Sequence, residues 1–233
     1  MRPFHISALS PLDFHGECRR SASCGGQHSG EFFDLIEMDG GSLTMTLGEL
    51  SGGGTGAPLV MSGLRASLRG FAENASTKLH GTIEALNRTV CGIAADDLYI
   101  QLFCARFDAA ARELTYVSAG HDPVLLVRRH FTRIRRLDST GALLGLTRRS
   151  EYRERTLPLE PGDLMLAFSS GINEIDALEI ASHDPDAPAA VLAHQIVQSA
   201  STGDGTVVVV RFNGKGSQTL FEDRAAEKVF AAA

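Results

Sequence analysis

The sequence lacks a run of about 20 apolar residues, the length that a helix needs to cross a bilayer. It also lacks an excess of basic residues, because 22 Lys and Arg stand against 28 Asp and Glu and give a net charge of −6. A nucleic-acid-binding surface needs clustered positive charge, so this class of partner is not expected. Residues 1–20 contain an early arginine but no apolar segment of signal-peptide length, so we expect neither secretion nor a membrane partner.

Cysteine is scarce as well, with four in the chain: Cys18, Cys24, Cys91 and Cys104. A chain of this length buries a core without cross-links, so these cysteines do not indicate a disulfide scaffold. Cys91 and Cys104 fall in apolar runs and are expected to be buried thiols. Cys18, Cys24 and His28 lack the two closely spaced pairs of a zinc finger, so we expect no zinc there. The expected compartment is the reducing cytoplasm.

What the sequence does contain is the composition of a soluble globular protein, with 43% hydrophobic and 21% charged residues. This apolar content excludes an intrinsically disordered chain. The length allows one large domain or two small ones, and we find no linker, repeat or low-complexity block. We therefore expect one domain over residues 1–212 and a polar, Ala-rich tail over 213–233. The acidic residues are either solvated surface or in part a metal site.

The N-terminal half of the sequence predicts strands and a helix pair. After weak strand character at 11–24, residues 32–38 and 43–47 are expected to form a β-hairpin around a turn at 39–41. A glycine-rich loop is expected at 48–56. Two amphipathic helices are then expected within 57–95, because apolar residues recur at helical spacing. These residues are Val60, Leu64, Leu68 and Ala72 in the first helix and Leu79, Ile83, Leu86, Val90 and Ile93 in the second.

Expected strands dominate the C-terminal half. They cover residues 98–107, 114–118, 123–128, 132–137, 151–157, 164–169 and 206–212. One helix is expected there, at 187–200. Because helices do not alternate with strands, a doubly wound parallel sheet is not favoured. Consecutive strands with two helical insertions favour an α+β fold, an antiparallel β-sandwich with helices on its outer faces.

Acidic and hydroxyl residues beside glycines recur at the expected strand ends, in segments 30–34, 48–52, 169–171 and 203–205. If these segments converge on one end of a sandwich, their carboxylates suit a hard divalent cation. Asp, Glu and Gly also populate ordinary turns. Spacing alone therefore leaves the metal site and the simple turns as open alternatives.

Six blocks of the sequence form a pattern in a fixed order. They are Gly30-Glu31-Phe32-Phe33-Asp34, Gly48-Glu49-Leu50-Ser51-Gly52-Gly53-Gly54, Ala119-Gly120-His121-Asp122-Pro123, Gly141-Ala142-Leu143-Leu144-Gly145-Leu146, Leu159-Glu160-Pro161-Gly162-Asp163, and the late pair Ser170-Gly171-Ile172-Asn173-Glu174 with Asp204-Gly205-Thr206. They resemble Gly-Asp-Phe-Tyr-Asp, Gly-Asp-Val-Ser-Gly-Lys-Gly, Ala-Gly-His-Pro-Pro, Gly-X-Pro-Leu-Gly, Leu-X-Pro-Gly-Asp, and Asp-Gly-Val-Thr-Glu with Asp-Asp-X-Thr.

These are the blocks of the SpoIIE branch of the metal-dependent protein phosphatase (PPM) family, bacterial phosphoserine and phosphothreonine phosphatases, which the chain resembles over about residues 29–212. The resemblance implies two antiparallel sheets flanked by helix pairs, an αββα order. It also implies two Mn²⁺ or Mg²⁺ ions that activate a bridging water for in-line attack on phosphorus. No covalent enzyme intermediate is needed, so no side chain has a catalytic role beyond holding the metal-bound water.

The resemblance assigns one set of residues to the metal ions and another to the framework around them. The metal positions are Glu31, Glu49, the Leu50 carbonyl, Ser170 and Asp204. The framework positions are Asp34, Gly120, His121, Gly171 and Glu174, where His121 is expected to hold a turn rather than act as a base.

Three of the metal positions depart from the aspartates of the family. Glu31 and Glu49 keep the charge but move the carboxylate outward by one C–C bond, about 1.5 Å. Such sites tolerate displacements of about 0.5 Å. Ser170 places a neutral hydroxyl where the family has an anionic ligand, which removes one of the charges that offset two dications. Asp176 or Glu174 would be the replacement carboxylate.

The departures favour a degenerate member of the family, a regulatory binding module in a bacterial partner-switching pathway. The implied partner is a phosphoprotein, an anti-sigma-factor antagonist of the STAS type. One alternative is an active Mn²⁺- or Mg²⁺-dependent protein phosphatase that tolerates glutamate. Another is an unrelated α+β domain. The apolar helix pair within 57–95 also leaves a homodimer open.

Overall fold

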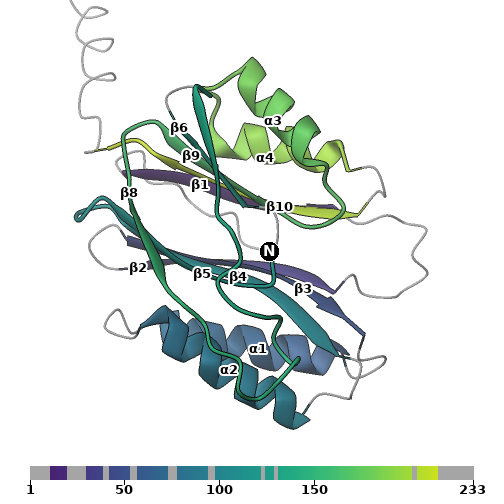
Figure 1. Cartoon of the computed structure of the whole chain (residues 1–233). Coiled ribbons are helices and arrows are strands. Elements are labelled where there is room, and N and C mark those ends of the chain that lie inside the picture. The colour runs from purple at the N-terminus through teal and green to yellow at the C-terminus, as the bar shows by residue number, and fades with distance from the viewer. Residues whose placement is uncertain are drawn as a thin grey trace, which may run out of the picture.

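Two five-stranded antiparallel sheets pack face to face in the computed structural model (Figure 1). The structure describes residues 11–19, 30–38, 42–52, 57–72, 78–93, 98–121, 124–128, 131–200 and 204–214. Sheet A contains, from edge to edge, β1 (Leu12–Arg19), β10 (Gly205–Phe212), β9 (Asp163–Phe168), β6 (Val124–Arg128) and β7 (Arg133–Arg136). Sheet B contains β2 (Glu31–Met38), β3 (Ser42–Ser51), β4 (Tyr99–Asp108), β5 (Glu113–Ala119) and β8 (Arg155–Pro158).

A pair of helices covers the outer face of each sheet (Figure 1). The helices α1 (Ala57–Ala72) and α2 (Leu79–Ile93) lie on sheet B, and α3 (Glu174–His183) and α4 (Ala189–Gln198) lie on sheet A. Among the described residues, no helix combines the length and the apolar character that a membrane crossing requires. The α+β sandwich expected from the order of elements is confirmed, and so is the αββα layering implied by the family resemblance.

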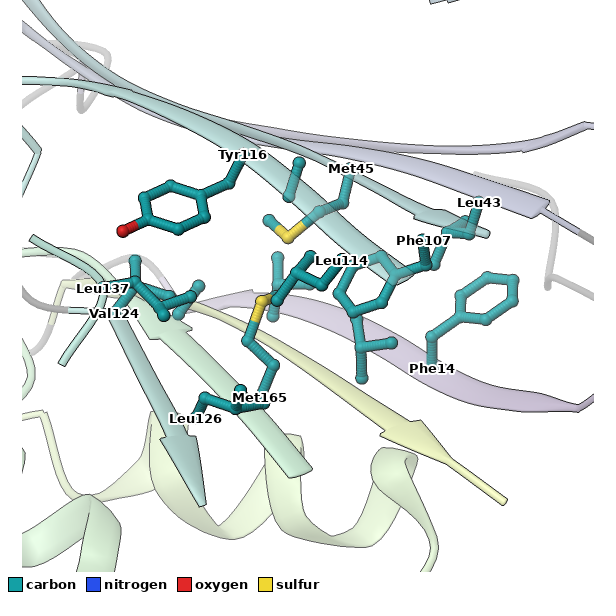
Figure 2. Close-up of a cluster of buried hydrophobic side chains, with 14 of the residues drawn as sticks. Phe14, Leu43, Met45, Phe107, Leu114, Tyr116, Val124, Leu126, Leu137 and Met165 are labelled. Atoms are coloured by element: carbon teal, nitrogen blue, oxygen red, sulfur yellow. The ribbon is translucent and has the colours of Figure 1, made fainter. Parts of the chain in front are cut away.

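Three apolar clusters hold the four layers together. The central cluster lies between the sheets, where Figure 2 shows Met45 and Leu114 of sheet B facing Leu126 and Met165 of sheet A. The other two clusters join sheet A to α3 and α4 and sheet B to α1 and α2. Since burying one such side chain contributes about 1.5–3 kcal/mol, these clusters supply the rigid frame on which strand-end residues are positioned.

Helix α3 was not predicted, and β1 is a full strand rather than a segment of weak strand character. The Asn173 side chain caps α3 by accepting hydrogen bonds from the backbone N–H groups of Ile175 and Asp176 at 2.8 and 3.3 Å. Only the small residues Ala177 and Ala181 of α3 are buried. A short helix with so small a buried face has no clear amphipathic pattern, which explains why periodicity missed it.

The glycine-rich loop expected from residue 48 begins later, because β3 continues to Ser51. Gly48 lies in the strand beneath an aromatic ring: a Cβ there would stand 2.3 Å from the Phe32 ring. Glu49 is paired with Gln101 on the neighbouring β4, so the ladder runs past the glycine. The expectation failed because the sequence alone does not distinguish a glycine that packs under an aromatic ring within a strand from a glycine in a turn.

The strand expected at 151–157 is confirmed only from Arg155 onward. The preceding residues leave the sheet toward α2, where the Glu154 carboxylate accepts a hydrogen bond from the backbone N–H of His80 at 3.1 Å. The Tyr152 ring is buried against Gly141, at which a Cβ would stand 2.3 Å from the ring. Tertiary contacts at this edge therefore override the local strand preference.

Two cysteine expectations have different outcomes. Cys104 is 2% exposed, and burial raises the pKa of its thiol to about 12, so the expected buried thiol is confirmed. Cys91 is only half-buried, so the same expectation was wrong there. The expectations for Cys24, His28, the turn at 39–41, Gly53, Gly54, Asp122, Pro123 and the tail beyond residue 214 lie outside the described residues.

Candidate functional site

Glu31 and Glu49 face each other across two neighbouring strands. Glu31 is the first residue of β2, Glu49 lies near the end of β3, and the two are directly paired in the antiparallel register. Side chains at directly opposed positions have Cβ atoms about 4.5–5.5 Å apart, and like charges there are destabilising. The pair therefore needs a hydrogen-bond donor or a cation nearby to offset the repulsion.

Hydroxyl groups from sheet A supply these donors. The Ser170 hydroxyl donates to Glu49 Oε1 at 2.8 Å, and the Ser170 backbone N–H donates to Glu49 Oε2 at 3.3 Å. The Thr206 hydroxyl donates to Glu31 Oε2 at 2.7 Å. We call the two hydroxyl contacts, Ser170 to Glu49 and Thr206 to Glu31, the carboxylate–hydroxyl clasp. The clasp joins the two sheets at one end of the sandwich, which we call the site end.

The residue Ser169 holds the two hydroxyl donors side by side. Its backbone N–H donates to the Thr206 carbonyl at 2.9 Å, and its hydroxyl accepts from the Thr206 N–H at 3.0 Å. Ser169 and Thr206 are both fully enclosed, at 1% and 0% exposure. Because these bonds tie the end of β9 to the start of β10, Ser170 and Thr206 have little freedom to move apart.

Two further metal positions of the family flank the clasp. The Leu50 N–H donates to the Gly30 carbonyl at 2.8 Å, and a Cβ on Gly30 would stand 2.2 Å from the Leu50 carbonyl oxygen. Only glycine fits this approach. Asp204 is partly exposed and directly precedes Gly205, the first residue of β10. The structure thus brings Glu31, Glu49 and Ser170 into one hydrogen-bonded group with Thr206. Asp204 precedes Thr206 by two positions in the sequence.

The framework residue Asp34 bonds to a helix instead of facing the clasp. Its carboxylate is 4% exposed and is held bidentately by Arg69 of α1, with both N–O distances 2.5 Å. The hydrogen bonds that Arg69 donates to Asp34, together with the negative charge of Asp34, raise the pKa of the Arg69 guanidinium. This ion pair fixes α1 onto β2 three residues from Glu31. Sequence patterning missed Arg69, because an arginine in an amphipathic helix is ordinarily a solvated residue.

His121 lies in the interior and not in an exposed cleft. It is 1% exposed, its carbonyl accepts from the Ser118 hydroxyl at 2.8 Å, and burial lowers the pKa of its ring to about 4. The preceding Gly120 has a φ of +66°, a conformation that favours glycine, and its N–H donates to the Gly141 carbonyl at 3.1 Å. These contacts fit a residue that holds a turn.

Neither replacement carboxylate considered from sequence is bonded to the clasp. Glu174, at the start of α3, forms an ion pair with Arg136 of β7. Asp176 lies in the first turn of α3, where its charge favours the helix N-terminus. Gly171 connects Ser170 to this helix. The acidic residues after Ser170 therefore serve α3 and β7.

The site offers fewer anionic oxygen ligands than the family resemblance implies for two divalent cations. Hard cations prefer several carboxylate and carbonyl oxygens, and the two glutamates here each accept a hydrogen bond from a hydroxyl. Ser170 contributes a neutral hydroxyl, which donates to Glu49, at the position where the resemblance implies an anionic ligand. Within the described ranges, His, Cys, Asp and Glu side chains form no group of three or more that could hold a metal ion.

Comparison with known proteins places this fold in a family. The model of the family described as Stage II sporulation protein E (SpoIIE) matches residues 39–213. The phosphoserine phosphatase RsbU of Bacillus subtilis is 27% identical over 150 residues, which is 64% of this chain and 44% of RsbU. The chain thus spans less than half the length of this relative.

Two solved structures show the same fold at lower identity. The RsbU and RsbW domains of Rv1364c from Mycobacterium tuberculosis match 94% of this chain and 68% of theirs, with a TM-score of 0.71 and 23% identity. The catalytic domain of the serine/threonine phosphatase PstP, in complex with two manganese ions, matches 86% of this chain and 97% of its own, with a TM-score of 0.67 and 17% identity. With the family match over most of its length, the chain belongs to the SpoIIE family, the SpoIIE-type branch of the PP2C-like (PPM) protein phosphatases.

Proposed function

We propose that the chain is a degenerate SpoIIE-type phosphatase domain that binds a phosphoprotein partner and hydrolyses it weakly or not at all. The observation that carries the proposal is the bond from the Ser170 hydroxyl to Glu49. The serine at this position donates a hydrogen bond to the carboxylate oxygen that, by the resemblance, would bind a metal ion. The clasp then joins the two sheets without a cation.

Charge at the site end supports the same proposal. By resemblance, four acidic side chains offset two dications, whereas this chain has Glu31, Glu49 and Asp204 with a neutral Ser170. The opposed glutamates also repel each other across the strands. A hydrogen bond to an ionised group contributes about 1.5–3 kcal/mol. The Ser170 and Thr206 hydroxyls thus offset the repulsion, and a cation competing for the glutamates has to displace them.

The proposed partner is a phosphorylated anti-sigma-factor antagonist of the STAS type. Support comes from the relative named phosphoserine phosphatase RsbU and from a solved structure that contains RsbU and RsbW domains. In this proposal the domain of residues 1–212 works in the cytoplasm and sequesters its partner rather than releasing phosphate. A homodimer through α1 and α2 is part of the proposal, since Leu59 on α1 is 80% exposed.

A second candidate function is an active metal-dependent phosphatase. Glu31 and Glu49 retain hard oxygen donors at the family positions, and Asp204 retains the family residue. A bound Mn²⁺ or Mg²⁺ would supply an activated water and neutralise phosphoryl oxygens. This candidate requires both glutamates to exchange their hydroxyl donors for metal ions.

Hydrolysis measured against a repaired variant separates the two candidates. The wild type and the triple variant Glu31→Asp, Glu49→Asp, Ser170→Asp are assayed with p-nitrophenyl phosphate and with a phosphoserine protein, with and without Mn²⁺. The proposal expects Mn²⁺-dependent turnover only in the triple variant. Turnover by the wild type at an ordinary enzymatic rate would refute it and establish the second candidate. If neither protein hydrolyses, equilibrium binding of the phosphoserine protein to the wild type decides, because absence of binding also refutes the proposal.

A further inference from the structure

Arginine is concentrated in one part of this acidic chain. Residues 128–155 contain nine arginines against three acidic residues, although the whole chain carries a net charge of −6. Two elements in this stretch are edge strands: β7 ends sheet A and β8 ends sheet B. All four residues of β7 (Arg133, Ile134, Arg135 and Arg136) are exposed.

The arginines of the two edges lie on the facing sides of the two sheets. Arg155 is paired with Tyr116 on β5, and Arg135 is paired with Leu126 on β6. Because Tyr116 and Leu126 both belong to the central cluster, the paired arginines lie on the inner faces of β8 and β7. Figure 2 shows Tyr116 beside Val124 and Leu137 at one end of the central cluster. Arg128 of β6 also donates a hydrogen bond to the Pro158 carbonyl of β8, so Arg135 and Arg155 lie at the same edge of the sandwich.

Among the described arginines of this stretch, Arg128 is paired with Glu160 and Asp163. Arg136 is paired with Glu174, but Arg133, Arg135 and Arg155 form no ion pair within the described part of the chain. Alternation along β7 puts Arg133 and Arg135 on one face and Ile134 with Arg136 on the other. The free arginines thus share the face that looks toward β8, and Ile134, at 44% exposure, offers an apolar contact on the opposite face.

The open edge of β7 is suited to a further strand. Its residues pair with β6 on one side, and no described strand pairs with the other side. A sheet edge presents unpaired backbone groups to which an extended peptide can add. Arg136 lies opposite Leu125 at the start of β6, and β6 begins beside Ala167 near the end of β9. A strand added to β7 would therefore run to the site end.

We propose that β7 and the neighbouring Arg155 form a docking edge for an acidic, extended segment of a partner protein. Glutamates or aspartates at alternate positions would face Arg133, Arg135 and Arg155, and the residues between them would pack on Ile134. A protein segment fits better than a nucleic acid, because the net negative charge of the chain repels a polyanion that extends beyond the edge. The inference deepens the proposed function, since it names the surface and chemistry by which the domain holds its partner.

The test uses a synthetic peptide with alternating Glu and Val and its Lys–Val counterpart, titrated into the full chain in EDTA by fluorescence anisotropy. The variant Arg135→Glu/Arg155→Glu is compared with Arg65→Glu/Arg88→Glu, which makes the same charge change at exposed helix positions. We expect the Glu–Val peptide to bind, the edge variant to weaken it about tenfold, and the control to weaken it less than about twofold. A Glu–Val peptide that is N-methylated at alternate residues cannot complete the backbone hydrogen-bond ladder. It should therefore bind the wild type no more tightly than the unmethylated peptide binds the edge variant.

Several outcomes overturn the docking edge. They are absence of Glu–Val binding, equal loss in the two variants, and undiminished binding of the N-methylated peptide. Tighter binding of a single-stranded RNA homopolymer or of anionic vesicles through Arg135 and Arg155 also overturns it, since the occupant would then be of another class. Circular dichroism verifies that each variant is folded, and Arg135→Gln/Arg155→Gln gives a milder change if the reversals unfold. Because EDTA removes metal-dependent hydrolysis, failure here is distinct from failure of the proposed function.

Discussion

Ser170 binds Glu49 through both its hydroxyl and its backbone N–H, at 2.8 and 3.3 Å. The two residues are 121 positions apart and belong to opposite sides of the sandwich. A neutral donor thus meets an acceptor at the point where the family resemblance places an acid beside a metal ion. The stability of the site end should therefore depend on this contact and not on added metal.

Removing the Ser170 hydroxyl tests this dependence. We expect Ser170→Ala to lower the free energy of unfolding by about 1 kcal/mol, since a hydrogen bond to a carboxylate at an exposed position is lost. Ser170→Asp should destabilise by a similar amount in EDTA, because a second carboxylate then faces Glu49. Chemical denaturation measures both changes. Ser182→Ala, in which an exposed hydroxyl of α3 is removed, serves as the control and should change stability by less than about 0.5 kcal/mol.

Thr206 provides the second half of the clasp and is fully buried. Thr206→Val keeps the shape but leaves Glu31 without its hydroxyl donor, so we expect a loss of about 1–3 kcal/mol. If the loss in Thr206→Val/Ser170→Ala exceeds or falls below the sum of the single losses, the two contacts are coupled through Ser169. A stable Thr206→Val protein with an unchanged denaturation midpoint would contradict the clasp.

The ion pair between Asp34 and Arg69 should contribute to stability by holding α1 on β2. Removing Arg69 leaves a buried carboxylate unpaired, and solvent around the half-exposed guanidinium screens part of the attraction. We therefore expect Arg69→Leu to cost about 2 kcal/mol, below the 3–5 kcal/mol of fully buried pairs. A double-mutant cycle with Asp34→Asn should give a coupling free energy of about 2 kcal/mol. Arg65→Leu, one turn earlier on α1, should be nearly neutral.

Acid sensitivity should come in part from His121. The folded-state pKa of about 4 lies below the ordinary value of 6.5, so the unfolded chain binds the proton more readily. Stability is then fully present above pH 6.5 and is lost as the pH falls toward 4, by about 3 kcal/mol in total. His121→Gln should flatten this part of the stability curve, while His183→Gln, at an exposed position, should leave it unchanged. Equal slopes for wild type and His121→Gln would exclude the buried imidazole as the cause.

Adding a methyl group at Gly30 tests whether glycine is required at this position. Its Cβ would stand 2.2 Å from the Leu50 carbonyl oxygen, whereas a Cβ at Gly63 of α1 meets nothing within 4 Å. We expect Gly30→Ala to cost about 2 kcal/mol or more by displacing backbone. Gly63→Ala should stabilise the protein by about 1 kcal/mol through helix propensity. Thermal unfolding of the two variants measures the difference, and a neutral Gly30→Ala would contradict the close approach.

Much of the fold could be predicted because apolar spacing repeats along the chain. The helix pair over 57–95 and the hairpin of β2 and β3 follow from it directly. Where the sequence prediction failed, the determining contacts are distant in sequence: the Phe32 ring over Gly48, and Glu154 bonded to α2. Helix α3 was missed because it buries only two alanines.

The sequence predicted which residues form the candidate site better than it predicted the hydrogen bonds between them. Motif order indicated Glu31, Glu49 and Ser170, and the structure brings these three into one group. Their bonding pattern could not be read from order alone, because the direction in which a hydroxyl donates depends on its neighbours in space. Thr206 and Ser169 stood in or beside the motifs, but their roles arise from the antiparallel pairing of β9 with β10.

In the proposed function, hydroxyl donors and not metal ions satisfy the two glutamates. Isothermal titration of Mn²⁺ into the wild type and into the variant Glu31→Asp/Glu49→Asp/Ser170→Asp tests it most directly. We expect no saturable heat for the wild type and stoichiometric binding of Mn²⁺ to the variant. Stoichiometric binding of two Mn²⁺ ions to the wild type would contradict it.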